Sequence, residues 1–311
     1  MVTVLSRAQG CLLGQLTGDA LGSLVEFQSP EEIRRGYPHG VRKLADGGTW
    51  NSIAGQPTDD SELALMLART LVDQGTYKPD AVFLAYQSWY ASDPFDCGTT
   101  IATALKGEPN LDSQANGALM RISPLGIFGI NYPLYTVADW ASQDAALTHP
   151  NAICRQINAL FAMALSHAIA KGCGAEDLYQ SIRNWSISMS VDAAILQVIE
   201  NAKTSPPPDY QTRQGWVLIA FQNSLWQLLH APSFEAGVIN TVMQGGDTDT
   251  NAAICGALLG AVYGIDAIPG QWTSQVLNCR PQYGDPAVKR PRPRCYWPVD
   301  AMELAEKLIE K

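Results

Sequence analysis

The stretch GCLLGQLTGDALG, residues 10–22, has a glycine at every fourth position, and GALLGAVYG, residues 256–264, repeats this spacing. Residues four apart share one face of a helix, so each stretch predicts a helix with a stripe that lacks side chains. A glycine inside a helix costs about 1 kcal/mol relative to alanine. Such repetition therefore indicates that something approaches the stripe closely. Tight packing against another helix is the simpler explanation, and a bound ligand is the alternative.

Helical periodicity also dominates the rest of the chain. Leu63, Met66, Leu67, Thr70 and Leu71 are spaced as one face of an α-helix. The same pattern recurs at 151–171, 191–202, 215–230, 251–263 and 299–311. The irregular stretches are 92–121, 205–208 and 281–298. None of these stretches separates two cores, and the alternation typical of strands is scarce. The sequence therefore predicts an all-α fold with one domain, residues 1–311.

The charge composition excludes one class of partner. The 311 residues include 21 Lys+Arg and 30 Asp+Glu, which gives a formal net charge of −9, and no long basic run is present. Nucleic-acid binding usually requires a basic surface, so we expect no nucleic-acid partner. Charged residues make up 16% of the chain, below the ~25% typical of globular proteins, so clusters of charge are more informative than usual.

The cysteines and the apolar segments bear on location. The seven cysteines are odd in number, scattered and without C-x-x-C spacing, which favours reduced thiols and the cytoplasm. Polar residues interrupt the apolar N-terminal stretch, so we expect no secretory leader. The longest apolar segment, 157–170, is shorter than the about 20 residues that a membrane span needs. It predicts a buried helix, and we expect no membrane association.

Two acidic clusters each open a predicted helix. They are PTDDS at 57–61 and GGDTDTN at 245–251. Helix capping is one explanation, because Thr58 is a good N-cap and carboxylates in the first turn complement the helix dipole. The same explanation applies to the second cluster. However, Asp247 and Asp249, two apart after a Gly-Gly turn, are more than one cap needs.

Taken together, the clusters indicate a site for hard cations. Their potential ligands are all oxygen: Thr58, Asp59, Asp60, Asp247, Asp249 and Thr250. Such a set suits Mg²⁺ or Mn²⁺, and four carboxylates are enough to hold two ions. A bound metal would also keep mutually repelling carboxylates ionised. An EF-hand beginning at Asp247 is excluded, because Ala252 and Leu258 stand where Gly and Glu are required, and the chain has no P-loop.

The chain resembles the ADP-ribosylglycohydrolase family in six motifs and in their order. This family includes dinitrogenase-reductase-activating glycohydrolases and ADP-ribosylarginine hydrolases. The motifs are GDALG at 18–22 with Glu26 downstream, PTDDS at 57–61, FDCGTT at 95–100, NGALMR at 116–121, THPNA at 148–152 and QGGDTDT at 244–250. The resemblance runs from about residue 10 to residue 272. Residues 40–50 are similar to the dinitrogenase-reductase-activating branch, whereas the loop at 96–100 lacks the extra polar residue that relatives often carry.

This resemblance implies a compact orthogonal helix bundle with two divalent cations, Mg²⁺ or Mn²⁺, at the base of a cleft. The six oxygen-bearing residues of the two clusters would be the metal ligands. Glu26 would position or deprotonate water, although alone it would be read as a surface residue, and Asp96 would face the modified side chain. The residues implied in substrate binding are Gly98, Thr99, Asn116, Gly117, Ala118, Met120 and His149. For His149, a structural hydrogen bond at a helix start is the alternative.

The implied activity is hydrolysis that releases ADP-ribose from a modified protein side chain, most simply the guanidinium of arginine. Serine-linked ADP-ribose or a small ADP-ribose derivative is the alternative substrate, and a noncatalytic ADP-ribose-binding protein would be expected to have eroded motifs. We expect a monomer. The basic segment with Lys289, Arg290, Arg292 and Arg294 predicts a surface loop that ties the last helix to the body, or an arm that docks a partner.

Overall fold

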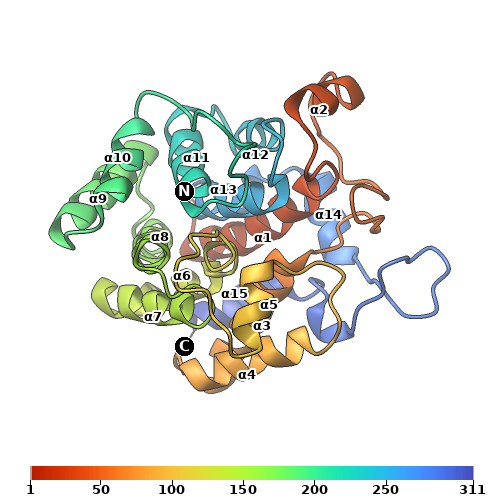
Figure 1. The fold of residues 1–311 in the computed structure, drawn as a ribbon, viewed down its shortest axis with the longest axis horizontal. Coiled ribbons are helices and arrows are strands. Elements are labelled where there is room, and N and C mark those ends of the chain that lie inside the picture. The colour runs from red at the N-terminus through yellow and green to blue at the C-terminus, as the bar shows by residue number, and fades with distance from the viewer. Residues whose placement is uncertain (1, 311) are drawn as a thin grey trace.

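Fifteen α-helices make up most of residues 2–310, the part of the chain that the computed structural model describes (Figure 1). In chain order they are α1 (Val4–Gly22), α2 (Pro30–Gly36), α3 (Asp59–Gln74), α4 (Pro79–Tyr90), α5 (Thr99–Leu105), α6 (Ser123–Phe128), α7 (Leu134–Ala146), α8 (Ala152–Lys171), α9 (Ala175–Ser188), α10 (Ala193–Asn201), α11 (Val217–His230), α12 (Phe234–Val242), α13 (Thr248–Tyr263), α14 (Gly270–Asn278) and α15 (Ala301–Ile309). Short 3₁₀ helices lie at Leu119–Arg121, Gly129–Asn131, Ile265–Ala267 and Arg294–Tyr296. Residues 2–310 contain two isolated β-bridges but no strand. The predicted all-α class is confirmed.

The two glycine stripes pack against each other at the centre of the molecule, where α1 and α13 run antiparallel (Figure 1). A Cβ atom on Gly10 would lie 2.5 Å from the carbonyl oxygen of Gly260. Cβ atoms on Gly14, Gly256 and Gly260 would come closer still to the facing backbone. The packing explanation for the stripes is therefore confirmed, because the two helices meet backbone to backbone.

The same contact brings the end of α1 to the beginning of α13. A Cβ atom on Gly22 would clash with the backbone of Asp249. The hydroxyl of Thr248 donates a hydrogen bond to the carbonyl oxygen of Gly22 at 2.8 Å. Glu26, four residues beyond α1, is thereby placed next to the acidic residues that open α13.

Most predicted helices occur within a few residues of the expected bounds. The segments 151–171, 191–202, 215–230, 251–263 and 299–311 correspond to α8, α10, α11, α13 and α15. The irregular assignment of 92–121 is wrong in part, because α5 and a 3₁₀ helix lie within it. Gly, Asp and Asn around the short α5 hide it from a periodicity argument. Lys311 lies outside the described residues.

α8 is a core helix, as predicted, although it is longer than the apolar segment suggested. It has 20 residues and is the single helix within 2–310 whose length and composition would suit a membrane span. However, 72% of its most apolar window is buried inside the protein. Burial among the other helices, rather than short length, accounts for its apolar character.

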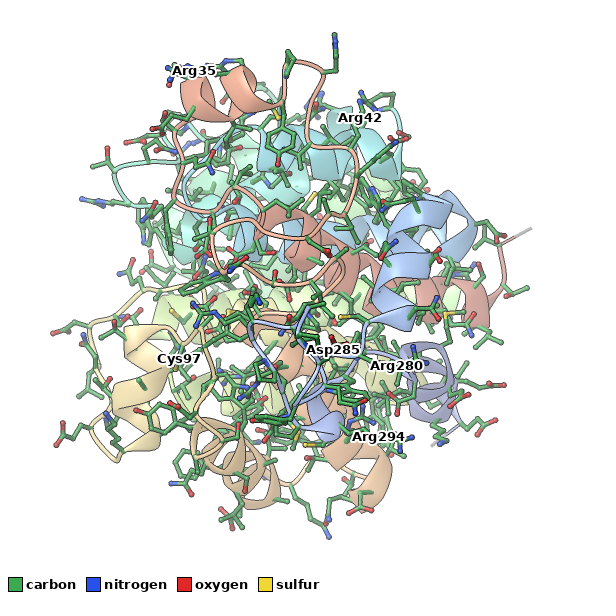
Figure 2. All side chains as sticks on the ribbon, turned by 90° about the vertical axis from the view of Figure 1, so that its right-hand side faces the viewer. Arg35, Arg42, Cys97, Arg280, Asp285 and Arg294 are labelled. Atoms are coloured by element: carbon green, nitrogen blue, oxygen red, sulfur yellow. The ribbon has the colours of Figure 1, made fainter. Side chains whose placement is uncertain are left out.

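The basic segment between α14 and α15 is a surface loop in which Arg292 is the one buried residue among the four basic residues named above. Arg292 is 3% exposed, and its Nη2 lies 2.7 Å from Glu62 Oε2 on α3. It also donates hydrogen bonds to the carbonyl oxygens of Ser92 and Asp93. Figure 2 shows Arg280, Asp285 and Arg294 on the face that carries this loop. Arg292 therefore ties the loop to the body, as the first of the two interpretations predicts.

Candidate functional site

A cleft of about 460 Å³ lies where the acidic helix starts meet the loops before α5 and α11. Most of the predicted site residues line it: Glu26, Asp59, Asp96, Gly98, Thr99, Asn116, Gly117, Met120, His149, Asp247, Asp249 and Thr250. The exceptions are Thr58, Asp60 and Ala118, which are buried and do not line the cleft. The cleft thus brings together predicted residues from six separate segments of the chain. Sequence reasoning missed two aromatic residues of the lining, Phe27 and Trp50.

The acidic residues open their helices as predicted, but their side chains do not cap them. Thr58 is the N-cap of α3, yet its hydroxyl hydrogen-bonds to Asp19 at 2.9 Å and to Asp60 at 3.2 Å. Asp247 is the N-cap of α13 without a capping hydrogen bond, and its Oδ2 accepts from the Asn116 amide at 2.7 Å. Capping by these side chains is therefore not the reason for either cluster.

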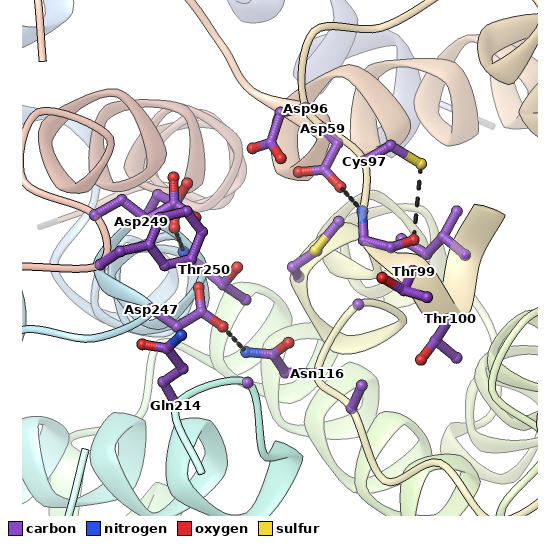
Figure 3. Close-up of a pocket in the computed structure, with 18 of the residues that line it drawn as sticks. Asp59, Asp96, Cys97, Thr99, Thr100, Asn116, Gln214, Asp247, Asp249 and Thr250 are labelled. Atoms are coloured by element: carbon purple, nitrogen blue, oxygen red, sulfur yellow. Dashed lines mark hydrogen bonds between the residues drawn. The ribbon is translucent and has the colours of Figure 1, made fainter. Parts of the chain in front are cut away.

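Five carboxylates form two overlapping groups that suit hard cations. Asp19, Asp60 and Asp249 make one group, and Glu26, Asp247 and Asp249 make the other, each with ligand atoms within 4.8 Å of one another. Asp249 belongs to both groups. Figure 3 shows Asp247 and Asp249 facing the same space as Asp59 and Asp96.

The chemistry of these donors fits a divalent cation. Asp60 Oδ1 is buried without a hydrogen-bond partner, which is costly unless a cation or water binds there. The hydroxyls of Thr58 and Thr250 hydrogen-bond to the other oxygen of Asp60, at 3.2 and 3.4 Å. Asp59, by contrast, lies outside both groups and accepts a hydrogen bond from the Gly98 amide at 3.1 Å.

Asp19 is a member of the site to which sequence reasoning assigned no role. It is fully buried and accepts hydrogen bonds from the backbone amides of Thr58 and Ser61 and from both of their hydroxyls. These bonds link α1 to the first turn of α3 and fix the acidic cluster there. A charged residue inside a buried, otherwise apolar and glycine-rich helix was the signal that could have identified it.

Burial and mutual repulsion strongly perturb the acids when no cation is present. Loss of hydration is the largest cause in every case, and neighbouring carboxylates add to it. The pKa is raised to about 6 at Asp59, about 7 at Asp19, about 8 at Glu26 and about 10 at Asp96. The pKa values of Asp60 and Asp249 also lie well above the ordinary range. The site therefore holds protons at neutral pH that a cation would displace.

Glu26 is buried at the edge of the cleft, so the expectation that it would lie on the surface if considered alone does not hold. Its side chain is 6% exposed. Trp50 Nε1 donates a hydrogen bond to Glu26 Oε2 at 2.6 Å, and the Thr49 hydroxyl donates to the Glu26 carbonyl oxygen at 2.9 Å. The turn at 47–52 thus fixes both the backbone and the carboxylate of Glu26.

The loop at 116–121 and His149 form a second, less acidic wall. His149 Nδ1 pairs with the Thr148 hydroxyl at 2.8 Å, whereas its Nε2 is buried without a partner. Burial lowers the pKa of His149 to about 3, so the ring is neutral. A Cβ atom on Gly117 would lie 3.1 Å from the His149 ring. The structural hydrogen bond is therefore present, and the other ring nitrogen remains available to a ligand.

A buried ion pair supports this wall from behind. Arg121 and Asp144 are both fully buried, with Nε and Oδ1 3.1 Å apart. Arg121 also donates to the Gly117 carbonyl oxygen at 3.2 Å and to the Thr148 hydroxyl at 2.9 Å. Because buried charges must be paired, this network holds the loop and the His149 segment in one arrangement.

Comparisons with known proteins identify the family of the chain. The family model for ADP-ribosylglycohydrolase matches residues 1–310. The chain is 29% identical to the ADP-ribosyl-[dinitrogen reductase] glycohydrolase of Rhodospirillum rubrum over 288 residues, 88% of this chain and 91% of the relative. It is also 29% identical to an ADP-ribosylarginine hydrolase of Pseudomonas putida over 295 residues, 88% of this chain and 74% of the relative.

A solved structure extends the likeness to the whole fold. A structure titled as an ADP-ribosylglycohydrolase-related protein complex superposes with a TM-score of 0.80 at 27% identity. The superposition covers 100% of this chain and 99% of that chain. Because the family model spans nearly the whole sequence and the fold agrees throughout, the chain belongs to the ADP-ribosylglycohydrolase family.

Proposed function

We propose that this glycohydrolase is metal-dependent and releases ADP-ribose from modified arginine side chains of proteins. The observation that carries the proposal is the pair of carboxylate groups that share Asp249 beside the cleft. The activities named for the relatives from R. rubrum and P. putida support the choice of substrate.

Two divalent cations, Mg²⁺ or Mn²⁺, would be held by Asp60, Asp247 and Asp249, with Thr58 and Thr250 beside them. Asp19 and Glu26 complete the two groups. When bound, such ions stabilise negative charge on oxygen and orient ribose hydroxyl groups. The predicted ligand Asp59 remains next to this set, where its carboxylate is held by the Gly98 amide.

The protein groups supply the proton transfers in the proposed hydrolysis. Glu26 Oε2 is occupied by the Trp50 indole, which leaves Oε1 to accept a proton from the attacking water. Asp96 lines the cleft among the other carboxylates, which raise its pKa, and would protonate the departing nitrogen. Two carboxyl groups acting on a glycosidic bond through an oxocarbenium-like transition state are the general pattern of glycoside hydrolysis.

The substrate linkage can be tested with paired peptides. We expect the protein to release ADP-ribose from an ADP-ribosyl-arginine peptide faster than from an ADP-ribosyl-serine peptide of matched sequence. A guanidinium departs as a cation beside acidic groups, whereas a serine hydroxyl has no such charge to stabilise. Chromatography of released ADP-ribose measures both rates. A preference for the serine peptide would contradict the proposal.

Metal binding should change the thermal stability of the protein even without substrate, and this change should depend on pH. The raised pKa values of Asp19, Glu26 and Asp59 exceed the about 4 expected in the unfolded chain. Between about pH 4 and pH 8 the folded cation-free protein therefore binds more protons, so its unfolding free energy falls as pH rises. Thermal melts should show a lower Tm at pH 8 than at pH 5 without metal.

Added Mg²⁺ or Mn²⁺ should raise the Tm more at pH 8 than at pH 5, because protons compete for the same oxygens. An ion at 100 times its Kd contributes about 2.7 kcal/mol to the unfolding free energy. Ca²⁺-free buffer with EDTA provides the baseline. A Tm that rises with pH in EDTA, or that does not change when metal is added at pH 8, would contradict this description of the site.

A further inference from the structure

Two aromatic residues, Phe27 and Trp50, line the cleft beside the acid Glu26, and we name them the aromatic wall. Their ring centroids are 6.5 Å apart at an interplanar angle of 75°. Phe95, the neighbour of Asp96 in sequence, supports Trp50 from behind with a centroid distance of 5.9 Å. The wall therefore adjoins both acids to which the proposed mechanism gives proton transfer.

Phe27 is held in this place at a conformational cost. Its φ angle is +66°, a region that non-glycine residues rarely adopt. The amide of Phe27 donates to the Gly246 carbonyl oxygen at 2.7 Å, and the Gly246 amide donates to the Gln28 carbonyl oxygen at 3.0 Å. These bonds fix Phe27 to the turn that precedes Asp247.

The ring of Phe27 is not used in the hydrophobic core. The residue is 54% exposed, and an exposed phenylalanine gains little from burial within its own chain. A disfavoured backbone conformation that persists next to an active site is typically retained for function. The backbone of Phe27 is therefore fixed in a way that orients the ring and does not bury it.

Trp50 is fixed equally firmly. Its indole donates to Glu26, and its carbonyl oxygen accepts a hydrogen bond from Arg290 Nε at 2.9 Å. The preceding residue, Thr49, donates its amide to the Ser23 carbonyl oxygen at 3.2 Å. The aromatic wall is thus preorganised, so a ligand that stacks against it does not have to order it first.

We infer that the aromatic wall is the subsite for the departing side chain and selects a planar guanidinium over an uncharged hydroxyl-bearing side chain. This inference rests on the proposed function. The negative faces of aromatic rings attract cations, and arginine in particular stacks on them. The wall lies beside Glu26 and close to Asp96, so a guanidinium there meets π faces and carboxylates together.

The protein already shows this kind of contact next to the aromatic wall. The guanidinium of Arg290 lies over Phe95, 5.9 Å from the ring centroid, on the segment behind Trp50. Arg290 is exposed and does not line the cleft, whereas Phe27 and Trp50 do, so a second guanidinium bound in the cleft would meet these two rings. A serine side chain carries no cation and cannot use these faces.

Phe27→Ala tests the inference directly. We expect kcat/KM for an ADP-ribosyl-arginine peptide to fall about tenfold, a size typical of losing one cation–π contact. The Kd of free ADP-ribose, measured by calorimetry, should stay unchanged, because the wall contacts the departing side chain. Phe27→Leu should show the same loss, because it keeps apolar bulk without a π face, and Phe27→Tyr should restore the rate.

Tyr135→Ala is the matched control, since Tyr135 is a 76% exposed aromatic residue of α7 away from the cleft. Full activity of Phe27→Ala or Phe27→Leu on the arginine peptide would overturn the inference while leaving the proposed function intact. A weakened Kd for ADP-ribose in Phe27→Ala would also overturn it, by assigning Phe27 to the adenine instead. Failure of the unmodified protein to cleave the arginine peptide would instead refute the proposed function itself.

Discussion

Replacing Asp249 by Asn is expected to reduce ADP-ribose release by about a thousandfold or more, because losing the stabilisation given by metal ions costs several kcal/mol in the transition state. Asp249 is the one residue that belongs to both carboxylate groups, so a single substitution weakens both potential metal sites. Asparagine keeps the shape of the side chain and removes only its charge. The effect on activity should therefore exceed that of any substitution confined to one group.

The fold should survive this substitution. Asp249 is buried among Glu26, Asp60 and Asp247, which raise its pKa by repulsion in addition to the effect of burial. Removing one acid from such a cluster relieves repulsion, so the Tm in EDTA should be unchanged or higher. The increase in Tm on adding Mn²⁺ at pH 8 should be lost. Asp73→Asn, at an exposed position of α3, is the matched control and should behave as the unmodified protein. Near-normal turnover by the Asp249 variant would contradict the proposal that Asp249 helps to hold both metal ions.

Replacing Gly260 by Ala is expected to lower the unfolding free energy by about 3 kcal/mol. This value is at the upper end of the range for overpacked cores, because the atom that faces the new side chain belongs to the backbone of α1 and cannot rotate away. The new Cβ would clash with the carbonyl oxygen of Gly10 across the α1–α13 contact. Neither helix can move away without separating the stripes that hold Glu26 next to Asp249. Chemical denaturation followed by circular dichroism measures the change.

Gly36→Ala provides the matched control for this helix substitution. Gly36 ends α2, and a Cβ atom there would meet nothing within 4 Å. With no clash, alanine at this position should leave stability unchanged or raise it by about 0.5–1 kcal/mol. Equal effects at Gly36 and Gly260 would show that backbone contact is not what the glycine stripe provides.

The parts of the fold that follow from local pattern could be predicted from the sequence. The glycine spacing at 10–22 and 256–264 indicated close approach, and α1 and α13 meet through those residues. The acidic clusters at 57–61 and 245–251 indicated helix starts that supply oxygen ligands, and the structure brings Asp60, Asp247 and Asp249 together. In each case the chemistry of a few neighbouring residues carried the information.

The parts that depend on contacts between distant segments could not be predicted. Trp50 reaches the Glu26 carboxylate across 24 residues, and Arg292 reaches Glu62 across 230. Asp19 supports Thr58 only because the fold places α1 against the start of α3. No periodicity marks such pairs, since each depends on how the helices pack. The short helix α5 was missed because its seven residues are too few to establish a repeat.

The most direct test of the proposed function is metal-dependent release of ADP-ribose from a protein that carries ADP-ribose on one defined arginine. The protein is first treated with excess EDTA, dialysed, and then assayed with and without added Mg²⁺ or Mn²⁺. We expect no release without metal and restored release when either ion is added. Equal release in excess EDTA, or no release under any metal condition, would contradict the proposed function.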